Sequence, residues 1–126
     1  MKLSDFELDV MQLFWERGPG SSPEIHTLIH DERPVSYSTV KTIIDRLEDK
    51  GALYRVRQEG RTIIYDAAVQ REVMSKSLLP VFLKRLFSGE PRQLMAQLIE
   101  EEPLDRSDIE YLQRMLEAKR VDEVEG

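Results

Sequence analysis

Cysteine is absent from the 126-residue chain, and tryptophan occurs only once. Without a thiol the chain forms no disulfide, holds no metal through thiolates and uses no cysteine nucleophile. No apolar run approaches the ~18–20 residues that a membrane-spanning helix needs. No basic segment followed by an apolar one opens the chain either. We therefore expect a cytoplasmic protein that does not enter a membrane, and we expect neither a metal nor another cofactor.

Charge is unevenly distributed along the chain. The net charge is −6, which by itself disfavours a nucleic-acid partner. Within residues 33–61, however, seven Lys and Arg stand against four Asp and Glu, so this window is +3. A local positive surface is what phosphate binding requires, because affinity comes from releasing counterions at the contact. The window therefore keeps a nucleic-acid partner open.

Residues 36–50 predict the helix around which the rest of the chain is organised. Ser36 is a suitable N-cap, and Gly51 ends the helix because glycine tolerates the left-handed backbone. Apolar residues at helical spacing form one stripe that faces a core: Val40, Ile43, Ile44 and Leu47. Short hydroxyl and amine side chains crowd the first two turns, which is typical of a helix that enters a major groove. A solvated amphipathic helix is the alternative interpretation.

Two helices are predicted before this one. Ser4 and Glu7 have the spacing of a capping box, and the helix they open ends near Arg17, before Gly and Pro residues. A second, shorter helix begins with Ser22 as the N-cap and Pro23 at the first helical position. Both helices carry apolar residues that suit packing against the helix at 36–50.

A β-hairpin is predicted directly after the third helix. Residues 53–57 and 61–65 alternate in polarity, and a Gly-containing connection separates them. Because a short hairpin is marginal alone, we expect four of its side chains to pack on the helices: Leu53, Val56, Ile63 and Tyr65. Three helices followed by a hairpin form a winged helix-turn-helix. We therefore predict a mainly α fold with a small β-hairpin, and a DNA-binding domain of this type over residues 1–68.

The remaining residues, 69–126, predict a helical dimerisation domain. Helices are expected over 69–89, with Pro80 kinking or dividing the helix, from Pro91, and from an N-cap at Asp105. So short a segment cannot bury its apolar faces alone, so we expect two copies to pack together. An appendage folded back on its own winged domain is the alternative. The residues expected at the dimer interface are Leu78, Phe82, Leu86, Phe87, Leu94, Leu98, Ile109, Leu112 and Leu116.

Specific roles follow for the expected DNA-binding residues. We expect Ser36, Ser38, Thr39, Lys41, Thr42 and Arg46 on the groove side of the third helix. There Lys41 or Arg46 pairs with guanine, and Thr39 or Thr42 meets a thymine methyl or a phosphate. Asp45 accepts from cytosine, ties down Lys41 or Arg46, or sits clear of the DNA. In the hairpin, Arg55, Arg57 and Arg61 are expected to contact phosphates and set the register without recognising sequence.

At this point the chain resembles the penicillinase repressor family, which includes β-lactamase, methicillin-resistance and copper-responsive repressors. The resemblance is strongest over residues 3–65 and looser after 69, where Phe82-Leu83 and Ser107-Asp108-Ile109 fit the helical order. The motifs that carry it are Leu3-Ser4, Glu7-Leu8-Asp9-Val10-Met11 with Trp15, Thr39-Val40-Lys41-Thr42, Arg46-Leu47, Lys50-Gly51-Ala52-Leu53, and Glu59-Gly60-Arg61 through Tyr65.

The resemblance implies a homodimeric winged-helix transcriptional repressor that sits on a palindromic operator. It implies control of β-lactam-resistance genes and release by a sensor protease pathway that cuts an Asn-Phe bond. The corresponding bond here is Gln97–Leu98, which departs from that pattern. The copper branch carries a cysteine cluster near its C-terminus, and this chain has no cysteine, so copper sensing is not expected.

Two other classes of function compete with a repressor. A winged-helix module that binds protein and never DNA is favoured by the acidic net charge. An enzyme is disfavoured because no nucleophile–base pair or phosphate loop is evident, and the only histidines are His26 and His30. Their spacing of four can bind zinc, but nothing completes a site, so we expect surface histidines.

Overall fold

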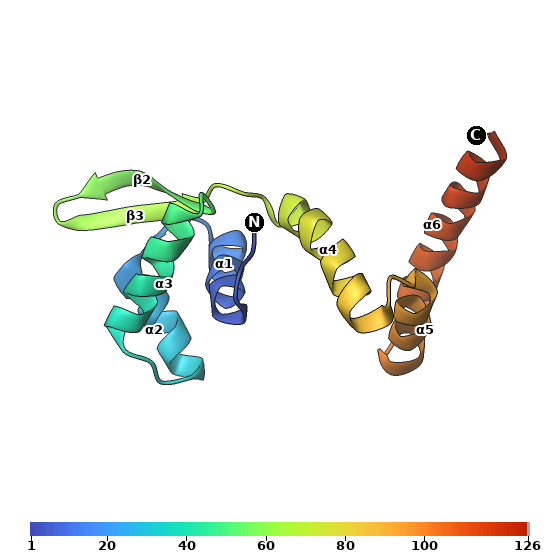
Figure 1. The fold of residues 1–126 in the computed structure, drawn as a ribbon, viewed down its shortest axis with the longest axis horizontal. Coiled ribbons are helices and arrows are strands. Elements are labelled where there is room, and N and C mark those ends of the chain that lie inside the picture. The colour runs from blue at the N-terminus through green and yellow to red at the C-terminus, as the bar shows by residue number, and fades with distance from the viewer. Residues whose placement is uncertain (126) are drawn as a thin grey trace. The chain divides into compact units, whose positions relative to one another are not determined.

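Serine caps open the first three helices in the computed structural model, which describes residues 1–125 (Figure 1). Helix α1, Asp5–Arg17, starts with the predicted capping box: Ser4 Oγ accepts from the Glu7 amide at 3.1 Å, and Glu7 Oε1 accepts from the Ser4 amide at 2.9 Å. Helix α2, Ser22–Glu32, starts with Ser21 as the N-cap, so the prediction of Ser22 is wrong by one residue. Glu24 stands three residues after Ser21, so only Ser21 completes the reciprocal pair.

Helix α3, Tyr37–Asp49, has the predicted ends. The Ser36 hydroxyl accepts from the Thr39 amide at 3.2 Å. Gly51 follows the helix with φ +81°, a left-handed conformation that a side chain would strain. The sequence prediction of this helix is confirmed at both ends.

Three antiparallel strands form one sheet in the order β1-β3-β2: β1, Gly20–Ser21, β2, Leu53–Glu59, and β3, Thr62–Ala67. The hairpin of β2 and β3, called the wing below, extends past α3 (Figure 1). Strand β1 was not expected. A bulge interrupts the hairpin, because Arg55 lies opposite Tyr65 whereas Arg57 lies opposite Ile64. Val56 is the extra residue and is 37% exposed, so the prediction that it packs on the helices is wrong.

The buried core joins the inner faces of α1, α2 and α3 to one side of the sheet. Leu53 and Tyr65 are buried as predicted, Ile63 packs partly against the core, and Ile64 is buried too. This core orients α3, because its apolar stripe faces inward and the opposite stripe faces solvent. The core residues are Val10, Met11, Phe14, Ile25, Ile29, Val40, Ile43, Ile44, Leu47, Ala52, Leu53 and Tyr65.

Trp15 fastens the segment that follows the wing. Its indole Nε1 donates to the Val69 carbonyl at 2.8 Å, directly before helix α4, Arg71–Phe87. Met74, in the first turn of α4, is 2% exposed. The chain accordingly divides into two compact units, Met1–Leu79 and Pro80–Gly126, of which the first contains the start of α4. The predicted functional boundary between residues 68 and 69 stays a prediction.

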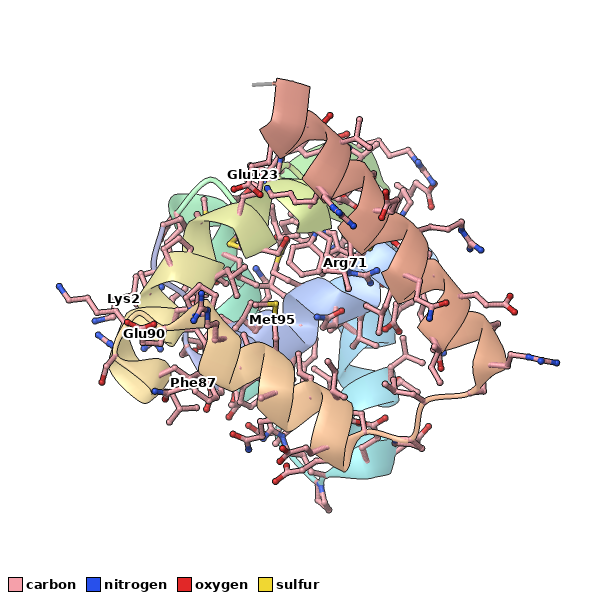
Figure 2. The ribbon with its side chains drawn as sticks, turned by 90° about the vertical axis from the view of Figure 1, so that its right-hand side faces the viewer. Lys2, Arg71, Phe87, Glu90, Met95 and Glu123 are labelled. Atoms are coloured by element: carbon pink, nitrogen blue, oxygen red, sulfur yellow. The ribbon has the colours of Figure 1, made fainter. Side chains whose placement is uncertain are left out.

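The second unit consists of the rest of α4, helix α5, Pro91–Glu101, and helix α6, Arg106–Glu125. Helix α4 continues through Pro80, which has no N–H to donate to the preceding turn. Asp105 precedes α6 as predicted, and its Oδ1 accepts from the Asp108 amide at 2.9 Å. Figure 2 faces this unit, with Phe87 on α4 and Met95 on α5 labelled. Within residues 1–125, no helix combines the length and apolar character needed to cross a membrane.

Candidate nucleic-acid interface

Exposed hydroxyl groups cluster where α3 begins. Ser36 Oγ lies 2.7 Å from Thr39 Oγ1 and 3.1 Å from Ser38 Oγ, and Thr42 Oγ1 donates to the Ser38 carbonyl at 2.9 Å. All four side chains are exposed, and the first turn carries no acidic residue. The structure therefore brings together the hydroxyl residues that the sequence predicted, on a face that points away from the core.

The predicted cations on α3 differ in how firmly they are held. Lys41 donates to Asp45 Oδ1 and lies 3.4 Å from the Tyr65 hydroxyl. Burial lowers the pKa of Lys41, but hydrogen bonds to Asp45 and Tyr65 outweigh it and leave the pKa above its usual value. Lys41 is therefore a protonated, tethered cation. Within the described chain Arg46 has no ion-pair partner and is exposed, so its guanidinium is free to reach a ligand.

The wing arginines also differ from one another. Arg55 pairs with Glu48 of α3, with Nε 2.8 Å from Oε2, and Arg57 pairs with Glu59, with Nε 2.6 Å from Oε1. Such solvent-exposed pairs contribute only about 0–1 kcal/mol, so exchanging a carboxylate for a phosphate costs little. Arg61 lies in the connection between β2 and β3, is exposed, and forms no ion pair among residues 1–125.

An ion pair that sequence reasoning missed fixes the far end of α3. Lys50 Nζ donates to Glu7 Oε1 of α1 and to the Lys2 carbonyl, each at 2.9 Å. Glu7 Oε2 lies 2.8 Å from the same nitrogen but without hydrogen-bond geometry. Burial raises the pKa of Glu7, yet hydrogen bonds from Lys50 and Ser4 outweigh it and hold the pKa below its usual value. The pair spans 43 positions, so no local pattern signals it.

Both histidines bind one backbone carbonyl in the turn between α2 and α3. His26 Nε2 lies 2.8 Å and His30 Nδ1 3.2 Å from the Val35 oxygen. The His26 ring also meets the Tyr37 ring edge-on at 5.8 Å. The described residues contain no group of three or more side chains suited to a metal ion. The two histidines thus brace the helix-turn-helix.

The residues predicted at the dimer interface lie on α4, α5 and α6 and remain partly or largely exposed. Phe82 is 44%, Leu98 48% and Leu116 65% exposed. Among residues 80–123, none is buried. A cavity of about 190 Å³ between α4 and α5 is lined by Phe82, Leu86, Phe87, Leu94 and Leu98, and also by Gln97, Glu101 and Glu102. The predicted cleavage bond, Gln97–Leu98, therefore lies in a helix and beside apolar side chains.

Comparison with known proteins gives the same assignment as the sequence motifs. The profile of the penicillinase repressor family matches residues 3–118. An uncharacterised 16.5 kDa protein in the ptsI 3′ region of Latilactobacillus sakei is 34% identical over 119 residues, which are 94% of this chain and 80% of that protein. The penicillinase repressor of Staphylococcus aureus is 28% identical over 116 residues, which are 92% and 91% of the two chains.

One solved structure is informative about the fold. The monomeric form of Bacillus licheniformis BlaI, in complex with the blaP half-operator, is 29% identical, with a TM-score of 0.50. The match covers 57% of this chain and 87% of that chain. These similarities confirm the predicted winged-helix fold and a repressor rather than an enzyme. The chain belongs to the penicillinase repressor family.

Proposed function

We propose that this repressor binds double-stranded DNA through α3 and the wing, as a homodimer on a palindromic operator. β-Lactam-resistance genes are the candidate targets, in keeping with the S. aureus penicillinase repressor, and a BlaI monomer was solved on a half-operator. The observation that carries the proposal is the outer side of α3, where hydroxyl groups and the unpaired Arg46 stand opposite a buried apolar stripe. Ser38, Thr39, Thr42 and Arg46 on that side are exposed, so a duplex can approach it.

Two kinds of contact follow from the geometry. Ser38, Thr39 and Thr42 are short, so they let the backbone of α3 approach the base edges, and Arg46 is long enough to pair with guanine. The wing arginines contact the sugar-phosphate backbone, which sets the register without selecting a sequence. Arg61 needs no exchange of an existing ion pair to do so, whereas Arg55 and Arg57 must give up Glu48 and Glu59.

Dimerisation is supported by the apolar side chains of the second unit. Helices whose apolar side chains stay half-buried or exposed in one chain gain free energy when a second copy covers them. Two winged units related by a twofold axis then recognise a palindrome with fixed half-site spacing. Each unit alone contacts only one half-site, so linking two of them raises the affinity by avidity.

Loss of the dimer provides the route by which repression ends. A cut at Gln97–Leu98 separates α6 and the last four residues of α5 from the DNA-binding unit, which removes much of the apolar surface. Because Gln97 is helical and its amide bonds Glu101 at 3.3 Å, a protease must first unwind α5 locally. A sensor protease pathway is the partner proposed for this step.

Selection of bound duplexes from a random pool tests the proposal. The full chain is expected to enrich a palindrome and to sediment as a dimer at micromolar concentration. A variant with Ser38→Glu and Thr42→Glu places two carboxylates on the outer side of α3 and is expected to enrich nothing. The matched control, Gln12→Glu with Gln70→Glu, adds the same charge to exposed positions away from α3 and is expected to enrich the same palindrome.

The rival function is a winged-helix module that binds only protein, which the net charge of −6 favours. A filter-binding assay with labelled duplex DNA separates the two functions. Failure of the parent chain to retain any duplex at low salt contradicts DNA binding and favours the rival.

A further inference from the structure

A shallow cavity of about 120 Å³ lies where α2, α3 and β3 meet. Among residues 1–125, its polar lining consists of four hydroxyl groups and two cations and includes no carboxylate. The hydroxyl groups belong to Ser22, Tyr37, Thr62 and Tyr65, and the cations are Lys41 and Arg61. This combination of donors suits an anion with several oxygen atoms.

The short strand β1 explains why these residues meet. Ser21 pairs with Ile64 of β3, which brings the start of α2 beside the wing. The first residue of α3, Tyr37, is brought to the same place by the turn that His26 and His30 brace. The backbone amide of Glu24 already donates to Ser21 in the capping box. The backbone at the N-terminus of α2 is therefore not the source of the cavity's donors. Side chains from three elements supply them instead.

Two of the donors belong to buried residues and lack an acceptor among residues 1–125. Ser22 is 4% exposed, and its hydroxyl has no hydrogen-bond partner among the described residues. Tyr65 is 1% exposed, and its oxygen accepts from Lys41 at 3.4 Å. The phenolic proton of Tyr65 therefore also lacks an acceptor within residues 1–125. Both hydroxyl groups belong to residues that line the cavity, where an anion can accept their hydrogen bonds in place of water.

We propose that this cavity binds one backbone phosphate of the DNA, between α3 and the wing, and that Lys41 contacts this phosphate instead of recognising a base. The inference rests on the proposed DNA binding and refines the sequence-based assignment of Lys41. The ammonium group of Lys41 is held between the Asp45 carboxylate and the Tyr65 hydroxyl, at the cavity wall. Arg61, from the connection between β2 and β3, adds a second positive charge to the lining.

A charge-neutral variant distinguishes a phosphate contact from a base contact. Lys41→Gln is expected to weaken binding to the selected operator and to a random duplex by the same factor. For both duplexes the slope of log K against log salt is expected to fall by about 0.9, the value for one phosphate. Lys76→Gln removes the same charge from an exposed part of α4 and is expected to change neither quantity. A loss confined to the operator, with an unchanged slope, makes Lys41 a base-recognising residue and overturns the inference.

Neutral methylphosphonate linkages locate the phosphate without relying on one variant. Replacing the half-site phosphates one at a time, in both halves, is expected to reveal one position where neutralisation weakens the parent chain but not Lys41→Gln. Ser22→Ala and Tyr65→Phe each remove only a hydroxyl group. In both variants, neutralising that same phosphate is expected to weaken DNA binding less than it does in the parent chain. If neutralising each phosphate weakens DNA binding by the same factor in the parent chain and in the variants, the cavity holds no phosphate. If the parent binds no duplex at all, the proposed function itself fails.

Inorganic phosphate is the other source of the same chemistry. Equal DNA affinity in phosphate and chloride buffers of matched ionic strength is expected for a site that takes the DNA backbone. If free phosphate displaces DNA from the parent chain but not from Lys41→Gln, the cavity is assigned to free phosphate. That result overturns the assignment to the DNA backbone.

Discussion

The two units of this repressor bury apolar side chains in opposite ways. Among residues 1–123, all fourteen buried hydrophobic residues lie between Val10 and Met74, in the unit Met1–Leu79. From Val81 to Val121, by contrast, twelve large hydrophobic side chains are exposed. The first unit thus completes its core within one chain. The described part of the second unit carries many large apolar side chains that its own chain leaves exposed. The free energy of unfolding of the first unit is expected to be independent of protein concentration. That of the second unit is expected to increase with protein concentration.

The largest effect is expected from Phe14→Ala in the first unit. Phe14 is 1% exposed, so truncation leaves a cavity and is expected to lower the free energy of unfolding by about 3–5 kcal/mol. Urea unfolding followed by circular dichroism measures the loss at two protein concentrations. Phe82→Ala, at a side chain that is 44% exposed, is the matched truncation. A loss at Phe14 that varies with concentration contradicts the assignment of a self-contained core.

The next effect concerns the second unit. Leu116→Glu places a charge on an apolar side chain that is 65% exposed in one chain, and it is expected to shift sedimentation from dimer to monomer. Operator affinity then falls by about 100-fold or more through lost avidity, while half-site affinity is unchanged. Gln113→Glu adds the same charge at an exposed polar position of α6 and should leave the dimer intact. A dimeric Leu116→Glu would remove this part of α6 from the interface.

A smaller effect is expected at the outer side of α3. Arg46→Ala is expected to reduce the preference for the selected operator over random duplex by about 1–3 kcal/mol, because a base contact is lost. Arg57→Ala, on the wing, is expected to weaken both duplexes alike. Competition gel shifts measure the preference directly. Equal losses for Arg46→Ala on both duplexes would count against base recognition.

The smallest effect depends on pH and tests how α1 holds α3. Glu7→Gln is expected to reduce stability by about 1–2 kcal/mol at neutral pH, because a charged hydrogen bond in a buried site is weakened. Since the pKa of Glu7 is lowered in the fold, this contribution is complete above the unfolded pKa, near 4.5, and is lost as the pH falls through the folded pKa. Denaturant titrations from pH 7 to pH 3 follow the difference, with Glu16→Gln as the exposed control. A difference that does not shrink as the pH falls contradicts the linkage.

Features determined by neighbouring residues were predictable from the sequence. The caps at Ser4 and Ser36 and the helix end at Gly51 depend on a few adjacent side chains, and all three predictions are confirmed. The start of α2 was misassigned although its signal was present, since Glu24 stands at capping-box distance from Ser21.

Features set by tertiary contacts were not predictable. The bulge that exposes Val56 breaks the alternation from which its burial was inferred. The Lys50–Glu7 pair and the two-residue strand β1 join distant segments without any local pattern. For the candidate site, the hydroxyl and cationic residues on α3 and the wing were identifiable by type and spacing. The hydroxyls of Ser22 and Tyr65 were not, because only the fold places them beside Lys41.

The indole of Trp15 gives this repressor a natural optical reporter. Trp15 is the only tryptophan in the chain. Its indole N–H donates to the carbonyl of Val69, in the segment that connects the wing to α4. Emission excited at the red edge of protein absorbance therefore comes from a single chromophore at that junction. Detachment of the α4 segment hydrates the ring and shifts the spectrum, so a cuvette measurement on unlabelled protein follows this junction in real time.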